Sequence, residues 1–303
     1  MPAVMTGYRF VPLADLAALR DALERDAAAA GLRGTILLAE EGINMTLAGP
    51  GEALAGFHLA LTAWPPFAGL EVRFSEAGDD IPVFRRLKVR IRPEIVRFGQ
   101  PGVAPHRRTG ERVDPARWHA LLDDPGVVVL DTRNDYEVAI GTFPGAVNPG
   151  TRAFRQFPAF VQRRLDPARH RRVAMFCTGG IRCEKASAWL LEQGFEAVYQ
   201  LDGGILGYLD QVTPDESRWR GECFVFDQRV AVDQRLRTGS HRQCFACRRA
   251  LSAADLESPH YREGVSCPYC IDEHDERRRA GFLERRRQVE LAAARGLTHL
   301  GPQ

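Results

Sequence analysis

The fold of this chain is decided by one stretch, Val173-Ala174-Met175-Phe176-Cys177-Thr178-Gly179-Gly180-Ile181-Arg182-Cys183. Its apolar start is typical of a buried strand in a parallel sheet, and a helix running through Leu191 should follow the glycines. Backbone N–H groups of such a loop form an anion-binding nest, which the helix N-terminus reinforces. A cysteine placed there should have a lowered pKa and exist largely as a thiolate, assisted by Arg182.

The spacing within this loop separates two chemistries. Four residues lie between Cys177 and Arg182, whereas the C-x5-R loop of cysteine phosphatases is a wider cradle that fits a tetrahedral phosphate. The tighter ring favours a persulfide-type cysteine, with Cys177 as the catalytic nucleophile. The alternative, a buried structural cysteine, does not need two glycines and an arginine beside it. The active-site loop then comprises Thr178, Gly179, Gly180, Ile181 and Arg182.

Cys183 lies one residue beyond Arg182, on the first turn of the expected helix. Two roles fit this position. It is either a resolving thiol for Cys177 or a small hydrophobe on the inner face of the helix.

The pattern around the loop predicts an α/β domain over residues 113–220. Strands and helices alternate there, which indicates a parallel sheet flanked by helices. The expected helices are Pro115–Leu122 and Phe154–Leu165, and the expected strands are Gly126–Leu130, Val173–Phe176 and Ala197–Leu201.

Residues 1–96 predict a separate, ferredoxin-like (acylphosphatase-like) α+β domain. Apolar residues recur at helical spacing over Leu13–Ala30, and the turn Glu40-Glu41-Gly42 joins two apolar runs as a hairpin does. The expected order β-α-β-β-α-β is that of the ferredoxin-like fold. The remaining expected elements are strands at Tyr8–Val11, Gly34–Leu38, Ile43–Leu47, Leu70–Phe74 and Val89–Ile91, and a helix at Glu52–Ala63.

Charge is unevenly distributed along the chain. The 303 residues carry a formal charge of only +2, yet residues 84–112 hold nine basic and two acidic side chains. This run ends in a basic linker, residues 97–112, and is either a solvated face or a footprint for a polyanion such as RNA. Its candidate RNA-binding residues are Arg85, Arg86 and Arg90. No apolar stretch is long enough to span a membrane and no signal peptide is present, so a cytoplasmic location is expected.

Residues 221–303 form a Cys-rich region in which four cysteines make two C-x2-C pairs separated by 19 residues. This spacing is typical of a structural zinc site, in which four thiolates complete a tetrahedron. Two reduced or disulfide-linked pairs and an iron–sulfur cluster are the alternatives. A charged helix over Glu273–Arg295 should follow. The expected metal ligands are Cys244, Cys247, Cys267 and Cys270.

Several stretches resemble a known family. Three stretches, taken with the cysteine loop, resemble the rhodanese domain: Asp131–Glu137, Gly141–Asn148 and Asp202-Gly203-Gly204. Nearly the whole chain is similar to the tRNA uridine(34) hydroxylase family. The similarity rests on the N-terminal unit with its stretch Ala39–Asn44, on Cys177–Ala186 and on the Cys-rich tail. The resemblance implies hydroxylation at C5 of the wobble uridine of tRNA to 5-hydroxyuridine, with O2 as co-substrate and Cys177 as the essential residue.

Two other functions remain open at the level of the sequence. One is a rhodanese-type sulfurtransferase that moves persulfide sulfur to an acceptor, for which a sulfur donor protein would be a further partner. The other is a non-enzymatic RNA- or protein-binding module, which would not need the intact cysteine and glycines. No flavin, haem or nicotinamide motif is evident. The expected partner of the hydroxylase is the anticodon arm of tRNA, held by phosphate contacts.

Overall fold

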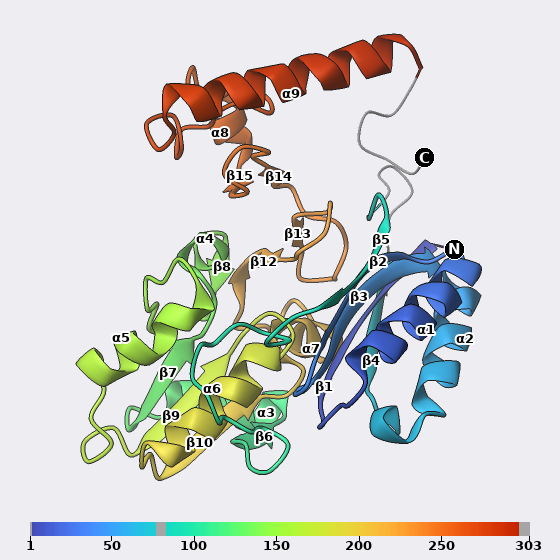
Figure 1. The fold of residues 1–303 in the computed structure, drawn as a ribbon. Helices are drawn as coiled ribbons and strands as arrows, with labels where there is room; N and C mark the ends of the chain where they lie inside the picture. Colours follow the sequence, from blue (N-terminus) through green and yellow to red (C-terminus); the bar gives the residue numbers. More distant parts are fainter. Residues whose placement is uncertain (1, 77–82, 297–303) are drawn as a thin grey trace.

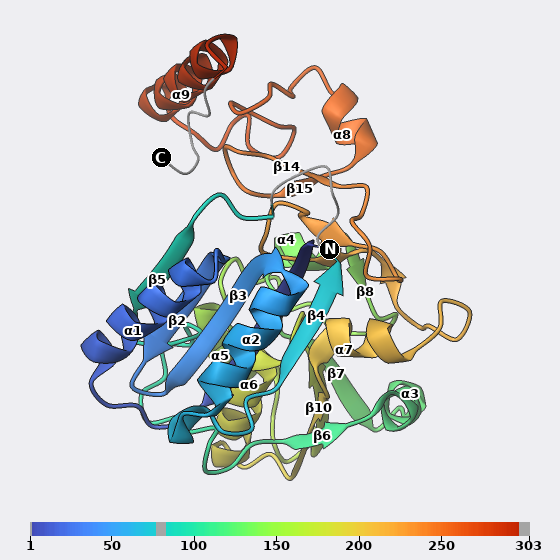
Figure 2. The ribbon, with the colours of Figure 1, turned by 90° about the vertical axis from the view of Figure 1, so that its right-hand side faces the viewer.

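The computed structural model describes residues 2–76 and 83–296. Two sheet-containing domains lie side by side, and the Cys-rich tail extends above them to a long terminal helix (Figures 1 and 2). The α+β domain is N-terminal, the parallel α/β domain is central, and the predicted fold class is confirmed.

The N-terminal domain has a sheet of strand order β4-β1-β3-β2-β5 with two helices on one face. The first four strands in this order make the ferredoxin-like arrangement, and β5 is added at the edge, parallel to β2. The elements are β1 (Pro2–Phe10), α1 (Leu16–Ala29), β2 (Arg33–Ala39), β3 (Gly42–Pro50), α2 (Gly51–Thr62), a 3-10 turn at Pro65–Phe67, β4 (Val72–Glu76) and β5 (Leu87–Ile91).

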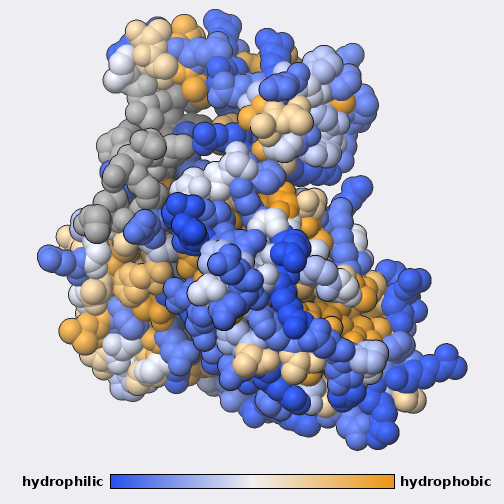
Figure 3. All heavy atoms as spheres, turned by 180° about the vertical axis from the view of Figure 1, so that it is seen from behind, coloured by the Kyte–Doolittle hydropathy of each residue, from blue (hydrophilic) through white to orange (hydrophobic). Residues whose placement is uncertain are grey.

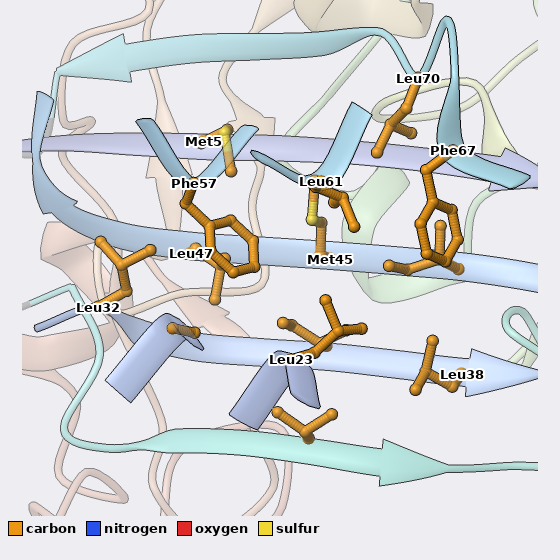
Figure 4. Packing of buried hydrophobic residues seen from close by; sticks show 14 of the residues in the cluster. Met5, Leu23, Leu32, Leu38, Met45, Leu47, Phe57, Leu61, Phe67 and Leu70 are labelled. Carbon is orange, nitrogen blue, oxygen red and sulfur yellow. The ribbon is translucent and has the colours of Figure 1, made fainter. Parts of the chain in front are cut away.

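The core of this domain lies between the helices and one face of the sheet. Met5, Met45 and Leu47 point from the strands toward Phe57 and Leu61 of α2 (Figure 4), and all are buried. Because side chains alternate along a strand, the intervening residues of β1 and β3 face the opposite side. That second face is turned toward the central domain.

The central domain has a parallel sheet of order β6-β10-β9-β7. Its inner strand β9 is fully buried from its second residue onward, as expected for a strand covered on both faces. The elements are β6 (Glu111–Val113), α3 (Pro115–Asp123), β7 (Val127–Asp131), α4 (Asp135–Val138), β8 (Gly141–Thr142), a 3-10 turn at Phe154–Gln156, α5 (Phe157–Arg164), β9 (Arg172–Phe176), α6 (Ile181–Glu192), β10 (Ala197–Leu201) and α7 (Gly204–Gln211).

The tail is built from short pieces. It contains β11 (Arg220–Gly221), β12 (Cys223–Phe224), β13 (Ala231–Val232), β14 (Arg242–Gln243), β15 (Ala250–Leu251), α8 (Ala253–Glu257) and α9 (Glu276–Ala294). Its first part is not independent, because Cys223, Val225 and Val232 pack into the core of the central domain. The terminal helix α9 buries none of its residues and lies at the far end of the molecule (Figure 1).

Hydrophilic side chains dominate the face shown in Figure 3, and hydrophobic residues form separate patches on it. Among the residues that the structure describes, no helix is long and apolar enough to cross a membrane.

Candidate active site and metal site

The cysteine loop lies at the carboxyl end of β9, where parallel α/β sheets commonly bind ligands. The Cys177 side chain is fully buried, and the backbone N–H of Gly180 donates a hydrogen bond to its Sγ at 3.1 Å. Gly180 adopts φ 97°, and a Cβ there would lie 2.7 Å from the Tyr8 hydroxyl. Gly204 at the start of α7 approaches the loop still more closely, because a Cβ there would lie 2.4 Å from the Cys177 carbonyl oxygen. Both glycines are therefore required by the packing.

The pKa of Cys177 lies well below its ordinary value. Burial alone would raise this pKa, but the Cys183 thiol, the charge of Arg182 and the N–H groups of Arg182 and Cys183 lower it to about 5. The pKa of Cys183 is raised well above its ordinary value by burial and by Cys177. At neutral pH, Cys177 is therefore the thiolate of the pair and Cys183 the protonated thiol.

Arg182 is ion-paired rather than free. Its guanidinium contacts both carboxylate oxygens of Glu137, each at 2.7 Å, and both side chains are buried. Glu137 thus compensates much of the positive charge beside Cys177, and the Cys183 thiol and the backbone N–H groups add to the thiolate's stabilisation. Nothing in the sequence pointed to Glu137 as the partner, because it lies 45 residues before Arg182.

Cys177, Thr178, Gly179, Ile181 and Arg182 line a cavity of about 1090 Å³ between the two domains. Gly180, the residue before α6, is buried and does not line the cavity. The opposite wall is the second face of the N-terminal sheet, including Thr6, Tyr8, Thr35, Asn44 and Thr46. The N-terminal domain therefore forms half of the site.

Tyr8 brings the two walls into contact. Its hydroxyl donates to Glu184 Oε1 at 3.4 Å, and Glu184 also pairs with Arg112. Burial and the charge of Glu184 raise the pKa of Tyr8 well above its ordinary value, so its hydroxyl keeps its proton. Tyr8 was expected only as a strand residue, and its place beside the cysteine loop depends on how the domains pack.

Lys185 links the domains next to this contact. It is 1% exposed, and its ammonium group lies 2.7 Å from Glu41 and 2.6 Å from Glu94. It also donates to the carbonyl oxygen of Val96 at 3.2 Å. Two stretches that resemble the same family, Ala39–Asn44 and Cys177–Ala186, thus meet at one buried cluster of charges.

The three candidate RNA-binding arginines lie beside the cavity rather than in it. Arg90 of β5 pairs in register with Leu37, which lines the cavity, so Arg90 is on the cavity side of the sheet. Arg86 precedes β5 by one residue and is exposed, and Arg85 precedes it by two. None of the three lines the cavity itself.

The four tail cysteines come together. Their sulfur atoms all lie within 4.8 Å of one another. The separations are 3.9 Å for Cys244–Cys270, 3.7 Å for Cys247–Cys267 and 3.5 Å for Cys267–Cys270. A zinc tetrahedron with Zn–S bonds of about 2.3 Å has sulfur–sulfur edges of about 3.8 Å. The donor set and its spacing therefore fit a metal such as zinc, held by Cys244, Cys247, Cys267 and Cys270.

Comparison with known families matches both domains. Residues 3–95 match the family described as the UPF0176 acylphosphatase-like domain, and residues 114–211 match the rhodanese-like domain.

Solved structures are similar to about a third of the chain. A rhodanese-related protein from Thermoplasma volcanium is 19% identical over 34% of this chain and 95% of that chain, with a TM-score of 0.29. The rhodanese-like domain of an Anabaena protein is 20% identical over 36% and 78%, with a TM-score of 0.30. A rhodanese-like domain protein from Staphylococcus aureus is 21% identical over 32% and 90%, with a TM-score of 0.27.

Proposed function

Because its two matched domains, in this order, make up the architecture of the tRNA uridine(34) hydroxylase (UPF0176) family, we propose that this protein is a tRNA-modifying oxidoreductase. It hydroxylates C5 of the wobble uridine to give 5-hydroxyuridine. One oxygen atom of O2 enters the C5–OH group, and the other takes up two protons and two electrons from an external reductant and leaves as water.

The observation that carries this proposal is the buried thiolate at an interdomain cavity. The cavity, at about 1090 Å³, is larger than most small-molecule pockets and has room for a nucleotide with part of its flanking backbone. Cys177 faces it from the central domain, and polar residues of the N-terminal sheet face it from the other side. A base must leave the anticodon stack to reach such a site, as in other enzymes that act on a base.

Mass spectrometry of tRNA nucleosides tests this function. A deletion strain should lack 5-hydroxyuridine and nucleosides derived from it, and a plasmid carrying Cys177→Ser should fail to restore them. Cys223→Ser is the matched control, because Cys223 is equally buried but burial raises its pKa to about 12. Restoration of the nucleosides by Cys177→Ser would remove Cys177 from the reaction.

A sulfurtransferase is the second candidate, favoured by the dimensions of the loop. Four residues separate Cys177 from Arg182, a tighter ring than a phosphatase loop, and the Gly180 N–H group lies 3.1 Å from the Cys177 sulfur. The same nucleoside measurement distinguishes the candidates. Loss of a thiolated wobble uridine with 5-hydroxyuridine retained would indicate sulfur transfer.

A further inference from the structure

One large aromatic side chain is exposed at the catalytic cavity. Phe226, two residues after β12, is 62% exposed and lines the cavity together with Cys177 and Arg182. Its ring contacts Phe224 edge-on, with centroids 5.3 Å apart, and the Arg182 guanidinium lies 5.9 Å from its centroid. The ring therefore stands next to the cysteine loop with much of its surface uncovered.

The segment that carries Phe226 is held firmly in place. The next residue, Asp227, forms a buried ion pair with Arg229 at 2.6 Å. Arg229 also donates to Ser75 Oγ and to the Glu76 carbonyl oxygen of β4, each at 2.9 Å. Phe226 is thus tied to both domains, and its exposure is a property of an ordered segment rather than of a loose loop.

The cavity around Phe226 is rich in uncompensated positive charge. Of its arginines, Arg112 and Arg182 are paired with Glu184 and Glu137, and Asp202 and Glu71 each lie 4.0 Å from Arg112. Within the described part of the chain, no carboxylate lies within ion-pair distance of the other four. These four are Arg9, Arg73, Arg97 and Arg155.

We propose that this cavity holds one unpaired nucleotide of a single-stranded RNA segment, with its base stacked on Phe226 and the flanking phosphates bound by these four arginines. The proposal rests on the proposed function, which makes RNA the substrate. Bases of single-stranded RNA stack on aromatic side chains, whereas a base inside a duplex has both faces covered. Arginine recognises phosphate oxygens through its planar fork of donors. Because Phe226 and Cys177 line the same cavity, a base stacked on Phe226 shares that cavity with the thiolate.

The experiment compares two probes on the full-length protein by fluorescence anisotropy. One is a labelled oligouridylate, and the other is an abasic ribose-phosphate oligomer of the same length, which has the phosphates without the bases. The wild-type protein should bind the oligouridylate about tenfold more tightly, as expected for one base–aromatic stack. Phe226→Ala should remove this preference and leave the affinity for the abasic probe unchanged, while Phe226→Trp should keep the preference.

The matched control is Phe245→Ala, because Phe245 is also an exposed phenylalanine but does not line the cavity. It should behave as wild type. An unchanged rate of Cys177 alkylation in Phe226→Ala shows that the loop is intact.

The outcomes separate this inference from the proposed function. A base preference that disappears in Phe226→Ala supports the stacking site even if the protein forms no 5-hydroxyuridine. A preference that Phe226→Ala retains overturns the stacking site even if the wild type hydroxylates tRNA. Equal affinity of the wild type for both probes also overturns it.

Discussion

Replacing Lys185 with methionine should weaken the contact between the two domains. Methionine fills a similar volume but has no charge, so the carboxylates of Glu41 and Glu94 would face each other without a cation. The Lys185 ammonium now lies between them, 2.7 Å from Glu41 and 2.6 Å from Glu94. Burial alone would raise the pKa of Glu94, but Lys185 and the N–H groups of Phe98 and Gly99 lower it below its ordinary value.

The expected loss of stability in Lys185→Met can be estimated from how deeply the ion pairs are buried. Removing one partner of a buried ion pair costs about 3–5 kcal/mol, and an exposed pair contributes at most about 1 kcal/mol. Lys185 is almost fully buried, whereas the Glu41 and Glu94 side chains are 20% and 21% exposed. We therefore expect a loss at the lower end, about 3 kcal/mol, which is roughly a 150-fold shift in an equilibrium constant.

Urea denaturation of the full-length protein measures this loss. Tryptophan fluorescence reports both domains, because Trp64 lies in the N-terminal domain and Trp118, Trp189 and Trp219 lie in the central one. Arg171→Met is the matched control, since it breaks an ion pair with Glu196 in which both side chains are more than half exposed. Adding Glu41→Gln and Glu94→Gln to Lys185→Met should restore part of the stability. Equal losses in Lys185→Met and Arg171→Met would refute the reasoning.

Three further predictions concern the Cys177 thiolate, the four-cysteine metal site and the three candidate RNA-binding arginines. The alkylation rate of Cys177 by iodoacetamide should rise as pH increases through about 5, because the pKa is lowered to that value, and should then level off; a midpoint near pH 8 would contradict it. Elemental analysis should find one zinc per chain, and chelation should unfold the tail before the central domain; protein purified without chelator and free of metal would exclude the site. Changing Arg85, Arg86 and Arg90 together to alanine should weaken tRNA binding and flatten its salt dependence. The control variant has alanine at Arg163, Arg164 and Arg169, which removes the same charge from a surface outside the cavity. Equal effects of the two triple variants on tRNA binding would mean that Arg85, Arg86 and Arg90 belong to a solvated face.

Much of the fold could be predicted because many of its helices and strands follow local patterns of apolar and polar residues. The strand expected at Ala197–Leu201 has those bounds in the structure, and α3 differs by one residue at its end. Boundaries failed where tertiary contacts override local propensity. β1 begins at Pro2 rather than Tyr8, because pairing with β3 and β4 on both sides keeps Gly7 and its neighbours extended.

Other elements had no local signal. β6 takes up Glu111 and Arg112, inside the segment expected to be a linker, because β10 offers it a parallel partner. α7 starts at the glycine pair of Asp202-Gly203-Gly204, and glycines are poor helix formers. That helix forms where Ile205 and Leu206 donate their N–H groups to the carbonyl oxygens of the cysteine loop, which only the folded chain provides.

The candidate site also has one part that local sequence predicts and another part that it does not. The thiolate could be expected at Cys177 because the strand, glycines and helix that create it are contiguous in sequence. Its partners could not, since Glu137 lies 45 residues from Arg182, and Tyr8 lies 176 residues from Glu184. The first contact depends on how α4 and α6 pack within the central domain, and the second on how the two domains pack. A single sequence does not encode either contact in a local pattern.

The two domains contribute different parts of the candidate site, and both parts affect which reaction the thiolate can perform. The loop provides a stabilised sulfur, and hydroxylation and sulfur transfer could both start from it. The N-terminal domain closes the cavity over that sulfur, with Tyr8 beside Gly180 and the polar face of the sheet opposite. A substrate must therefore fit between the domains before it can reach Cys177. Because Lys185 joins these walls through ion pairs with Glu41 and Glu94, we expect substrate selection to depend on the interdomain contact as well as on the cysteine loop.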